Sequence, residues 1–204
     1  MSYFITIEGP EGSGKTTVIK AIADHLIARF DVVCTREPGG IKISEDIRKI
    51  LLDEANVMDY RTEALLFAAS RRQHLIEKVL PALQKGEIVI CDRFIDSSLA
   101  YQGYARGIGM DEIRSINEFA IEGKYPDLTL YLKVSAEIGL NRIKDNSRET
   151  NRLDKEAIDF HEQVVEGYDI LAAQYPERIR IIDAEQSSEQ VVSESMKWIN
   201  QLLN

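Results

Sequence analysis

The sequence is poor in cysteine and has no long apolar run, and these two absences exclude several classes of protein. Among its 204 residues the only cysteines are Cys34 and Cys91, each at the end of an apolar segment. We therefore expect buried, reduced thiols, as in a cytosolic protein, and neither a disulfide nor a catalytic cysteine. Apolar stretches such as 88–91 are far too short to cross a bilayer, which takes about 20 residues. We expect no signal peptide, since no basic segment leads into a long apolar core.

Positive charge and histidine are also scarce. The 25 lysines and arginines face 34 acidic residues, which gives a formal net charge of −9. Proteins that bind nucleic acid usually need a basic face, so we expect no such partner, although a local basic pocket for a small anion remains possible. His25, His74 and His161 lack paired ligand spacing and predict neither a metal site nor an acid–base role. Without repeats or linkers, the chain is expected to form one domain over residues 1–204.

The most informative motif lies near the N-terminus, where residues 9–16 read Gly-Pro-Glu-Gly-Ser-Gly-Lys-Thr. An apolar, β-branched run at 4–7 precedes it, and apolar residues at helical spacing follow it as far as Phe30. A strand, a glycine-rich turn and a helix in this order predict a phosphate-binding loop. Its backbone N–H groups would hold phosphate oxygens, Lys15 would reach the outer phosphates and Thr16 would offer a hydroxyl to Mg²⁺. The chain is therefore predicted to bind a nucleoside triphosphate.

Apolar strand-like runs alternate with helical patterns along the whole chain. Strands are predicted at 3–8, 31–35, 87–91, 128–134 and 178–183. Helices are predicted at 14–30, 45–53, 60–84, 97–106, 111–122, 136–146, 155–174 and 188–203. This alternation predicts a parallel sheet covered by helices on both faces, with ligands beyond the carboxyl ends of the strands.

Asp92 and Arg93 follow the third predicted strand and suggest the type of reaction. Asp92 comes directly after an apolar run, the Walker B position for a carboxylate that holds Mg²⁺ directly or through water. Many nucleotide hydrolases place a water-activating glutamate next, where this chain has Arg93. An arginine there suits a phosphate bound bidentately, which favours transfer to a second phosphorylated molecule over hydrolysis. An ion pair between the two residues at the strand end is the alternative. The guanine-binding N-K-x-D motif is absent, which excludes GTPases.

Two further groups of residues suit a nucleotide. Phe67 and Arg71 are four residues apart on a predicted helix, so a base could stack on one and hydrogen-bond to the other. A core position for Phe67 is the alternative. Ser98, Tyr101 and Gln102 follow the metal carboxylate and could line its pocket, although a serine there could simply cap a helix.

The segment 142–154 contains three arginines and loses apolar periodicity after its second residue. We interpret residues 143–153 as a short lid whose arginine closes over the triphosphate and stabilises the charge that develops during transfer. The phosphate-binding loop has no arginine of its own, which favours this interpretation over a solvated run of charges.

These features resemble those of bacterial thymidylate kinases, which are P-loop nucleoside monophosphate kinases, over essentially the whole chain. The most specific pieces are the loop at 9–16 with Glu11 inside it, Arg36-Glu37-Pro38-Gly39-Gly40, the Phe67 and Arg71 pair, and Asp92-Arg93-Phe94 running on to Tyr101-Gln102-Gly103. Phe94 replaces the tyrosine that is usual in the family, and we expect no loss of activity from that change.

The resemblance implies a three-layer α/β/α P-loop fold with a five-stranded parallel sheet, and a homodimer in the cytoplasm. It implies transfer of the γ-phosphoryl group of ATP to dTMP, with Mg²⁺ as cofactor, giving dTDP for dTTP synthesis. A related kinase acting on another nucleotide is one alternative, and an ATP-dependent switch protein is another. The absence of a hydrolytic glutamate after Asp92 and the second anion site argue against the switch.

The resemblance also assigns roles to individual residues. The catalytic residues would be Lys15, Asp92, Arg93, Arg148 and Arg152. The ATP-binding residues would be Gly9, Pro10, Glu11, Gly12, Ser13, Gly14, Lys15, Thr16, Thr17 and Arg142. The residues that bind dTMP would be Glu11, Glu37, Arg48, Phe67, Arg71, Arg93, Ser98, Tyr101 and Gln102. The Mg²⁺ ligands would be Thr16 and Asp92.

Among these residues, Glu11 would approach the 3′-hydroxyl of dTMP and Phe67 would stack on thymine, while Arg71 would bind the polar edge of the base. Arg93 would bind the acceptor phosphate. Tyr101 would pack where a ribose 2′-hydroxyl would sit, which would disfavour ribonucleotides.

Overall fold

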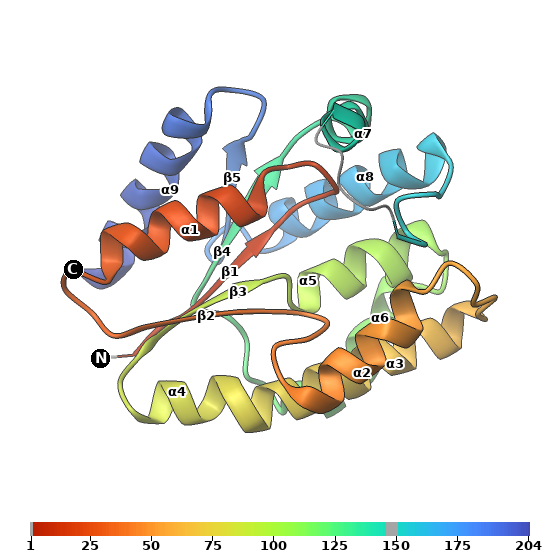
Figure 1. Cartoon of the computed structure of the whole chain (residues 1–204), viewed down its shortest axis with the longest axis horizontal. Coiled ribbons are helices and arrows are strands. Elements are labelled where there is room, and N and C mark those ends of the chain that lie inside the picture. The colour runs from red at the N-terminus through yellow and green to blue at the C-terminus, as the bar shows by residue number, and fades with distance from the viewer. Residues whose placement is uncertain (1, 146–150) are drawn as a thin grey trace.

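Five parallel strands form one sheet at the centre of the molecule (Figure 1). The computed structural model describes residues 2–145 and 151–204. The strands are β1 (Phe4–Glu8), β2 (Val32–Arg36), β3 (Ile88–Asp92), β4 (Leu128–Lys133) and β5 (Ile179–Asp183), in the spatial order β2-β3-β1-β4-β5. All four strand pairs are parallel. Each strand lies within one residue of its predicted position.

The helices cover both faces of this sheet. They are α1 (Lys15–Leu26), α2 (Lys42–Leu52), α3 (Tyr60–His74), α4 (Leu80–Gln84), α5 (Ile95–Ser98), α6 (Met110–Ile121), α7 (Ala136–Asp145), α8 (Ile158–Gln174) and α9 (Ser188–Leu203). The predicted three-layer α/β/α arrangement with a five-stranded parallel sheet is confirmed (Figure 1). In the described part of the chain, none of the helices combines the length and apolar character needed to span a membrane.

Alternation of side chains along β1 divides the core into two layers. Ile5 and Ile7 pack with residues of α1 and α9 on one face of the sheet. Phe4 points to the other face, where it packs with residues of α3 to α6 and α8. Glu8 follows the same alternation as Phe4, which leaves a fully buried carboxylate at the carboxyl end of the central strand.

Two predicted helices contain π-helical turns that the sequence pattern did not indicate. The predicted helix at 60–84 is α3, the π-helical segment Leu75–Val79, and α4. Pro81 lies just after this segment, and in a regular α-helix its ring would clash with the carbonyl of Glu77 and leave that carbonyl without a donor. The predicted helix at 97–106 is the end of α5 followed by the π-helical segment Leu99–Ala105.

One prediction about the cysteines is wrong. Cys91 is buried, but Cys34 is exposed. Cys34 lies in β2, which is at the edge of the sheet, and the residues of this strand are at most half-buried. An apolar run therefore did not guarantee burial there.

Candidate active site

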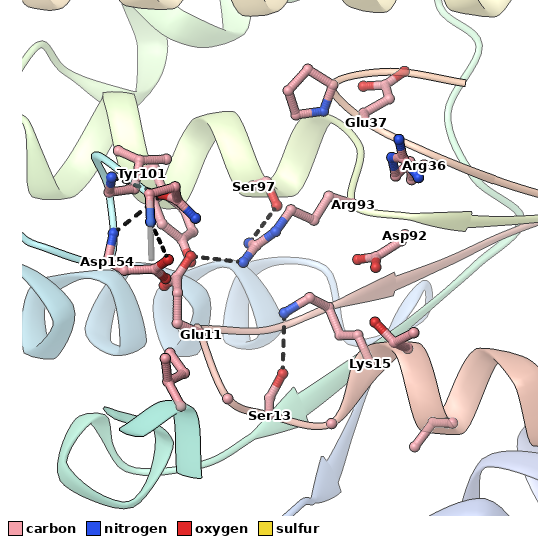
Figure 2. Close-up of a pocket in the computed structure, with 18 of the residues that line it drawn as sticks. Glu11, Ser13, Lys15, Arg36, Glu37, Asp92, Arg93, Ser97, Tyr101 and Asp154 are labelled. Carbon is pink, nitrogen blue, oxygen red and sulfur yellow. Dashed lines mark hydrogen bonds and ion pairs between the residues drawn. The ribbon is translucent and has the colours of Figure 1, made fainter. Parts of the chain in front are cut away.

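A cavity of about 620 Å³ opens at the carboxyl ends of β1, β2 and β3 (Figure 2). Most of the predicted site residues line it, namely Glu11, Gly12, Ser13, Gly14, Lys15, Thr16, Thr17, Glu37, Arg48, Phe67, Arg71, Asp92, Arg93, Ser98, Tyr101, Gln102 and Arg142. A cavity of this size is typical of small-molecule sites. The structure thus brings together residues that are far apart in the sequence.

The phosphate-binding loop connects β1 to α1, and Lys15 folds back over it. The ammonium group of Lys15 donates to the carbonyl oxygens of Gly9 and Pro10 at 3.0 and 2.9 Å and to Ser13 Oγ at 3.2 Å. Burial lowers the pKa of Lys15 to about 8, and the nearby charge of Arg93 adds to this effect. A phosphate group would offer this desolvated cation a charged partner in place of neutral carbonyls.

Asp92 and Thr16 provide oxygens suited to Mg²⁺. Asp92 Oδ1 is buried and has no hydrogen-bond partner among the described residues. Thr16, at the start of α1, lines the same cavity. Mg²⁺ usually takes only one or two protein ligands and fills its coordination sphere with water and substrate phosphate. The donor set therefore fits Mg²⁺, and in the described part of the chain no cluster of three or more acidic, histidine or cysteine side chains could hold a metal by itself.

Arg93 has a left-handed backbone conformation and a set of anchored side-chain contacts. Its φ is 68°, which is strained for a residue other than glycine. Its guanidinium donates to Glu11 Oε1 at 2.9 Å and to Ser97 Oγ and the Tyr168 hydroxyl at 3.2 and 3.3 Å. It also lies over the ring of Tyr101, 4.9 Å from its centroid. Arg93 therefore pairs with the phosphate-binding loop, and not with Asp92 as in the strand-end alternative (Figure 2).

Glu8, at the end of β1, binds the residues that follow Arg93. Its Oε1 accepts from the backbone N–H of Phe94 at 2.7 Å, and its Oε2 accepts from Ser97 and Tyr168 at 2.6 and 2.8 Å. Burial raises the pKa of Glu8 to about 7, with Asp96 acting in the same direction, although the hydrogen bond from Ser97 lowers it. The sequence analysis did not assign Glu8 a role, because a strand-end glutamate gives no sign of its partners.

Arg71 is almost completely buried and lines the cavity. It donates from Nε to Glu37 Oε2 at 2.8 Å, and from its terminal nitrogens to Ser98 Oγ at 2.9 Å and the Phe94 carbonyl at 2.8 Å. Phe67, one turn earlier in α3, is half-buried and lines the cavity too. A flat aromatic ring and a fixed guanidinium thus face the same space.

Glu37 holds Arg71 in place and is itself held by a histidine. Its Oε1 lies 2.9 Å from His74 Nδ1, while His74 Nε2 lies 2.7 Å from Thr35 Oγ1. Both carboxylate oxygens of Glu37 are therefore used within the protein. The sequence analysis missed His74, whose partners come from β2 and the turn after it.

The predicted lid cation Arg152 does not line the cavity. Its guanidinium contacts Glu63, a fully buried carboxylate in α3, and donates to the Leu51 carbonyl at 3.0 Å. Gln102 and Arg106 contact the same carboxylate. The predicted Arg148 and the rest of 146–150 lie outside the described residues, so the lid stays a prediction.

Three comparisons with known proteins give the same family. The family model described as thymidylate kinase matches residues 7–195. The chain belongs to the thymidylate kinase family. It is 57% identical to a thymidylate kinase of Staphylococcus haemolyticus and 59% identical to one of Staphylococcus epidermidis, each over 98% of both chains. The crystal structure of a thymidylate kinase from Ehrlichia chaffeensis is similar, with 35% identity, a TM-score of 0.80 and 98% of each chain covered.

Family membership makes the chain an ATP-dependent kinase of dTMP, as the sequence analysis expected. It argues against the ATP-dependent switch and against a kinase of another nucleotide. Most of the predicted nucleotide-binding residues lie around one cavity at the carboxyl ends of the strands.

The buried carboxylate of Glu8 predicts a pH-dependent contribution to stability. A carboxyl group whose pKa is raised on folding stabilises the native state at low pH, and this contribution is lost as the pH rises through about 7. We expect the free energy of unfolding of the native chain, relative to Glu8→Gln, to fall by about 2 to 3 kcal/mol between pH 5 and pH 8. Urea unfolding of both proteins across this range measures it. A pH-independent difference would contradict a raised pKa at Glu8.

Proposed function

We propose that the cavity binds the donor and the acceptor of the reaction at two anion sites, which face each other across Asp92. The phosphate-binding loop and Lys15 form the donor site for ATP. Arg93 and Arg48 form the acceptor site for the phosphate of dTMP. The observation that carries this proposal is the buried, unpartnered Asp92 Oδ1, whose carboxylate interacts electrostatically with Lys15 of the donor site and with Arg48 and Arg93 of the acceptor site. A second group of cations would be unnecessary for hydrolysis alone.

The base end of dTMP would lie between Phe67 and Arg71. Phe67 would stack on thymine, and Arg71 and Ser98 would face the polar edge of the base. Contacts with Glu37 and the Phe94 carbonyl already fix the orientation of the Arg71 guanidinium. Glu11 would accept a hydrogen bond from the sugar 3′-hydroxyl. An arginine that already donates to Glu37, Ser98 and the Phe94 carbonyl can hydrogen-bond to a base without losing much further entropy on binding.

The acceptor is already a phosphate, so positioning and neutralisation of charge suffice and no strong general base is required. Lys15 would hold the transferred group from the donor side and Arg93 would hold the acceptor oxygens. Thr16 and Asp92 would hold Mg²⁺, which, when bound, neutralises charge on the phosphate oxygens. The lid predicted at 143–153 would exclude water during transfer.

We further propose a homodimer formed by α3 and α6. Leu65 in α3 and Ile76 in the π-helical segment that follows it are exposed at 57% and 41%, and Phe119 in α6 is exposed at 88%. The two helices are joined by Arg72, which donates to the Ala120 carbonyl at 3.2 Å. Large apolar side chains gathered on neighbouring helices are typical of an interface between subunits. We place this dimer in the cytosol, where the free thiols of the chain stay reduced.

Turnover should depend strongly on the acceptor nucleotide. In a coupled ADP-release assay with ATP, we expect dTMP to be the best of dTMP, dUMP, dCMP, UMP and AMP. Loss of one methyl group should cost dUMP roughly tenfold or more in kcat/KM. Comparable turnover with AMP or UMP would contradict the proposed base and sugar contacts.

Replacing Arg93 by alanine should damage use of dTMP far more than binding of ATP. We expect kcat/KM for dTMP to fall about a hundredfold or more, because a charge-assisted contact to phosphate is lost. Titration with a non-hydrolysable ATP analogue should show nearly unchanged affinity. Arg114→Ala, at the surface of α6 where Arg114 pairs with Asp111, is the matched control and should leave both values unchanged. Equal losses for dTMP and for the ATP analogue would contradict the assignment of Arg93 to the acceptor phosphate.

The dimer has its own test. Phe119→Glu places a charge on the proposed interface and should convert a dimer to a monomer in sedimentation analysis. Val57→Glu changes another fully exposed apolar residue, in the loop before α3, and should leave the dimer intact. A native chain that sediments as a monomer would refute the proposal directly.

A further inference from the structure

His161 is a buried polar side chain that no step of the proposed reaction has used. It lies in α8 and is 1% exposed. Neither of its ring nitrogens has a hydrogen-bond partner among the residues that the structure describes. An unpaired buried N–H lowers stability, so an imidazole kept in this place suggests a role in binding.

The ring of His161 faces Glu11 in the phosphate-binding loop. His161 Nδ1 lies 3.6 Å from Glu11 Oε2, just beyond hydrogen-bonding distance. The same oxygen accepts a hydrogen bond from the Tyr101 hydroxyl at 2.6 Å, while Oε1 accepts from Arg93 at 2.9 Å. Figure 2 shows Glu11 between Tyr101 and Arg93 at the wall of the cavity.

The surroundings of Glu11 keep it ionised. Burial by itself would raise the pKa of this carboxyl group, but Arg93, His161 and Lys15 together hold the pKa well below its ordinary value. An ionised carboxylate only accepts hydrogen bonds, and it has about four acceptor positions. Tyr101 and Arg93 take two of them.

We propose that His161 is a positioning residue for recognition of the nucleotide sugar. A small movement lets Nδ1–H donate to Glu11 Oε2, so that Tyr101 and His161 occupy both acceptor positions of that oxygen. Arg93 occupies one position on Oε1, and the remaining position on Oε1 is left for the 3′-hydroxyl of the acceptor. The inference rests on the proposed function, in which Glu11 binds the sugar of dTMP.

Two substitutions separate this role from simple packing. His161→Phe keeps an aromatic ring but removes both nitrogens, and His161→Asn retains a donor close to the position of Nδ1. We expect the Phe variant to unfold at the same or a higher temperature than the native chain, since an apolar ring replaces unpaired polar atoms. Its kcat/KM for dTMP should nevertheless fall about tenfold, mainly through KM, as one hydrogen bond to a charged group is lost.

The acceptor analogue without a 3′-hydroxyl, 3′-deoxythymidine monophosphate, makes the test specific. Its kcat/KM should change little in His161→Phe, and His161→Asn should recover most of the activity with dTMP. Equal losses for both nucleotides, or no loss with dTMP, would overturn the proposal. Should the Phe variant not fold, His161→Gln is compared with His161→Asn, because Gln places its donor near Nε2 and should not restore dTMP use.

Glu11→Gln distinguishes failure of this inference from failure of the proposed function. If Glu11 binds the sugar, Glu11→Gln should reduce the preference for dTMP over the 3′-deoxy analogue, and His161→Phe should add nothing in that background. If Glu11→Gln leaves the preference intact, the sugar contact in the proposed function is wrong. If Glu11→Gln reduces the preference for dTMP over the 3′-deoxy analogue but His161→Phe does not, the role of His161 is refuted and the sugar contact of Glu11 stands.

Discussion

The ion pair between Arg93 and Glu11 joins the two halves of the site. Glu11 belongs to the phosphate-binding loop, the proposed donor site, and Arg93 belongs to the turn after β3, the proposed acceptor site. Both side chains are largely buried, so their attraction is screened far less than that of a surface pair. In the proposed function the pair would fix the distance between the two anion sites, on which in-line phosphoryl transfer depends.

A second layer of buried carboxylates makes this geometry rigid. Glu8 and Glu11 are three residues apart, yet their pKa values are shifted in opposite directions. Glu8 is near Asp96 and is bound by neutral donors, so burial dominates and its pKa is about 7. Glu11 faces Arg93 and Lys15, which outweigh its burial. The first carboxylate supports the strained turn at Arg93, while the second binds the arginine itself.

The sequence could predict the sheet and the phosphate-binding loop because each depends on local patterns. Buried parallel strands appear as short apolar runs, and the loop has a fixed spacing of glycines before a lysine. The supporting residues could not be found in this way. Glu63, Glu37 and His74 have partners that are distant in the sequence, and periodicity does not show which buried polar groups meet. The partners of Arg152 lie in α2 and α3, about 90 to 100 residues earlier in the chain.

The partners of the cations show how the site separates support from binding. Arg71 and Arg152 are paired with the buried carboxylates of Glu37 and Glu63, and such charge-assisted contacts are strong enough to hold a side chain in place. Lys15, in contrast, donates to backbone carbonyls and a serine hydroxyl.

Arg48 and Arg142 follow the pattern of Lys15. Arg48 donates to the Pro38 carbonyl at 2.9 Å, and Arg142 donates to the Ala184 carbonyl at the same distance. A neutral carbonyl attracts a guanidinium less than a phosphate does, so these side chains can exchange their partners when a nucleotide arrives. Buried carboxylates therefore fix Arg71 and Arg152, while the cations with neutral partners are available for the phosphates that the proposed function assigns to them.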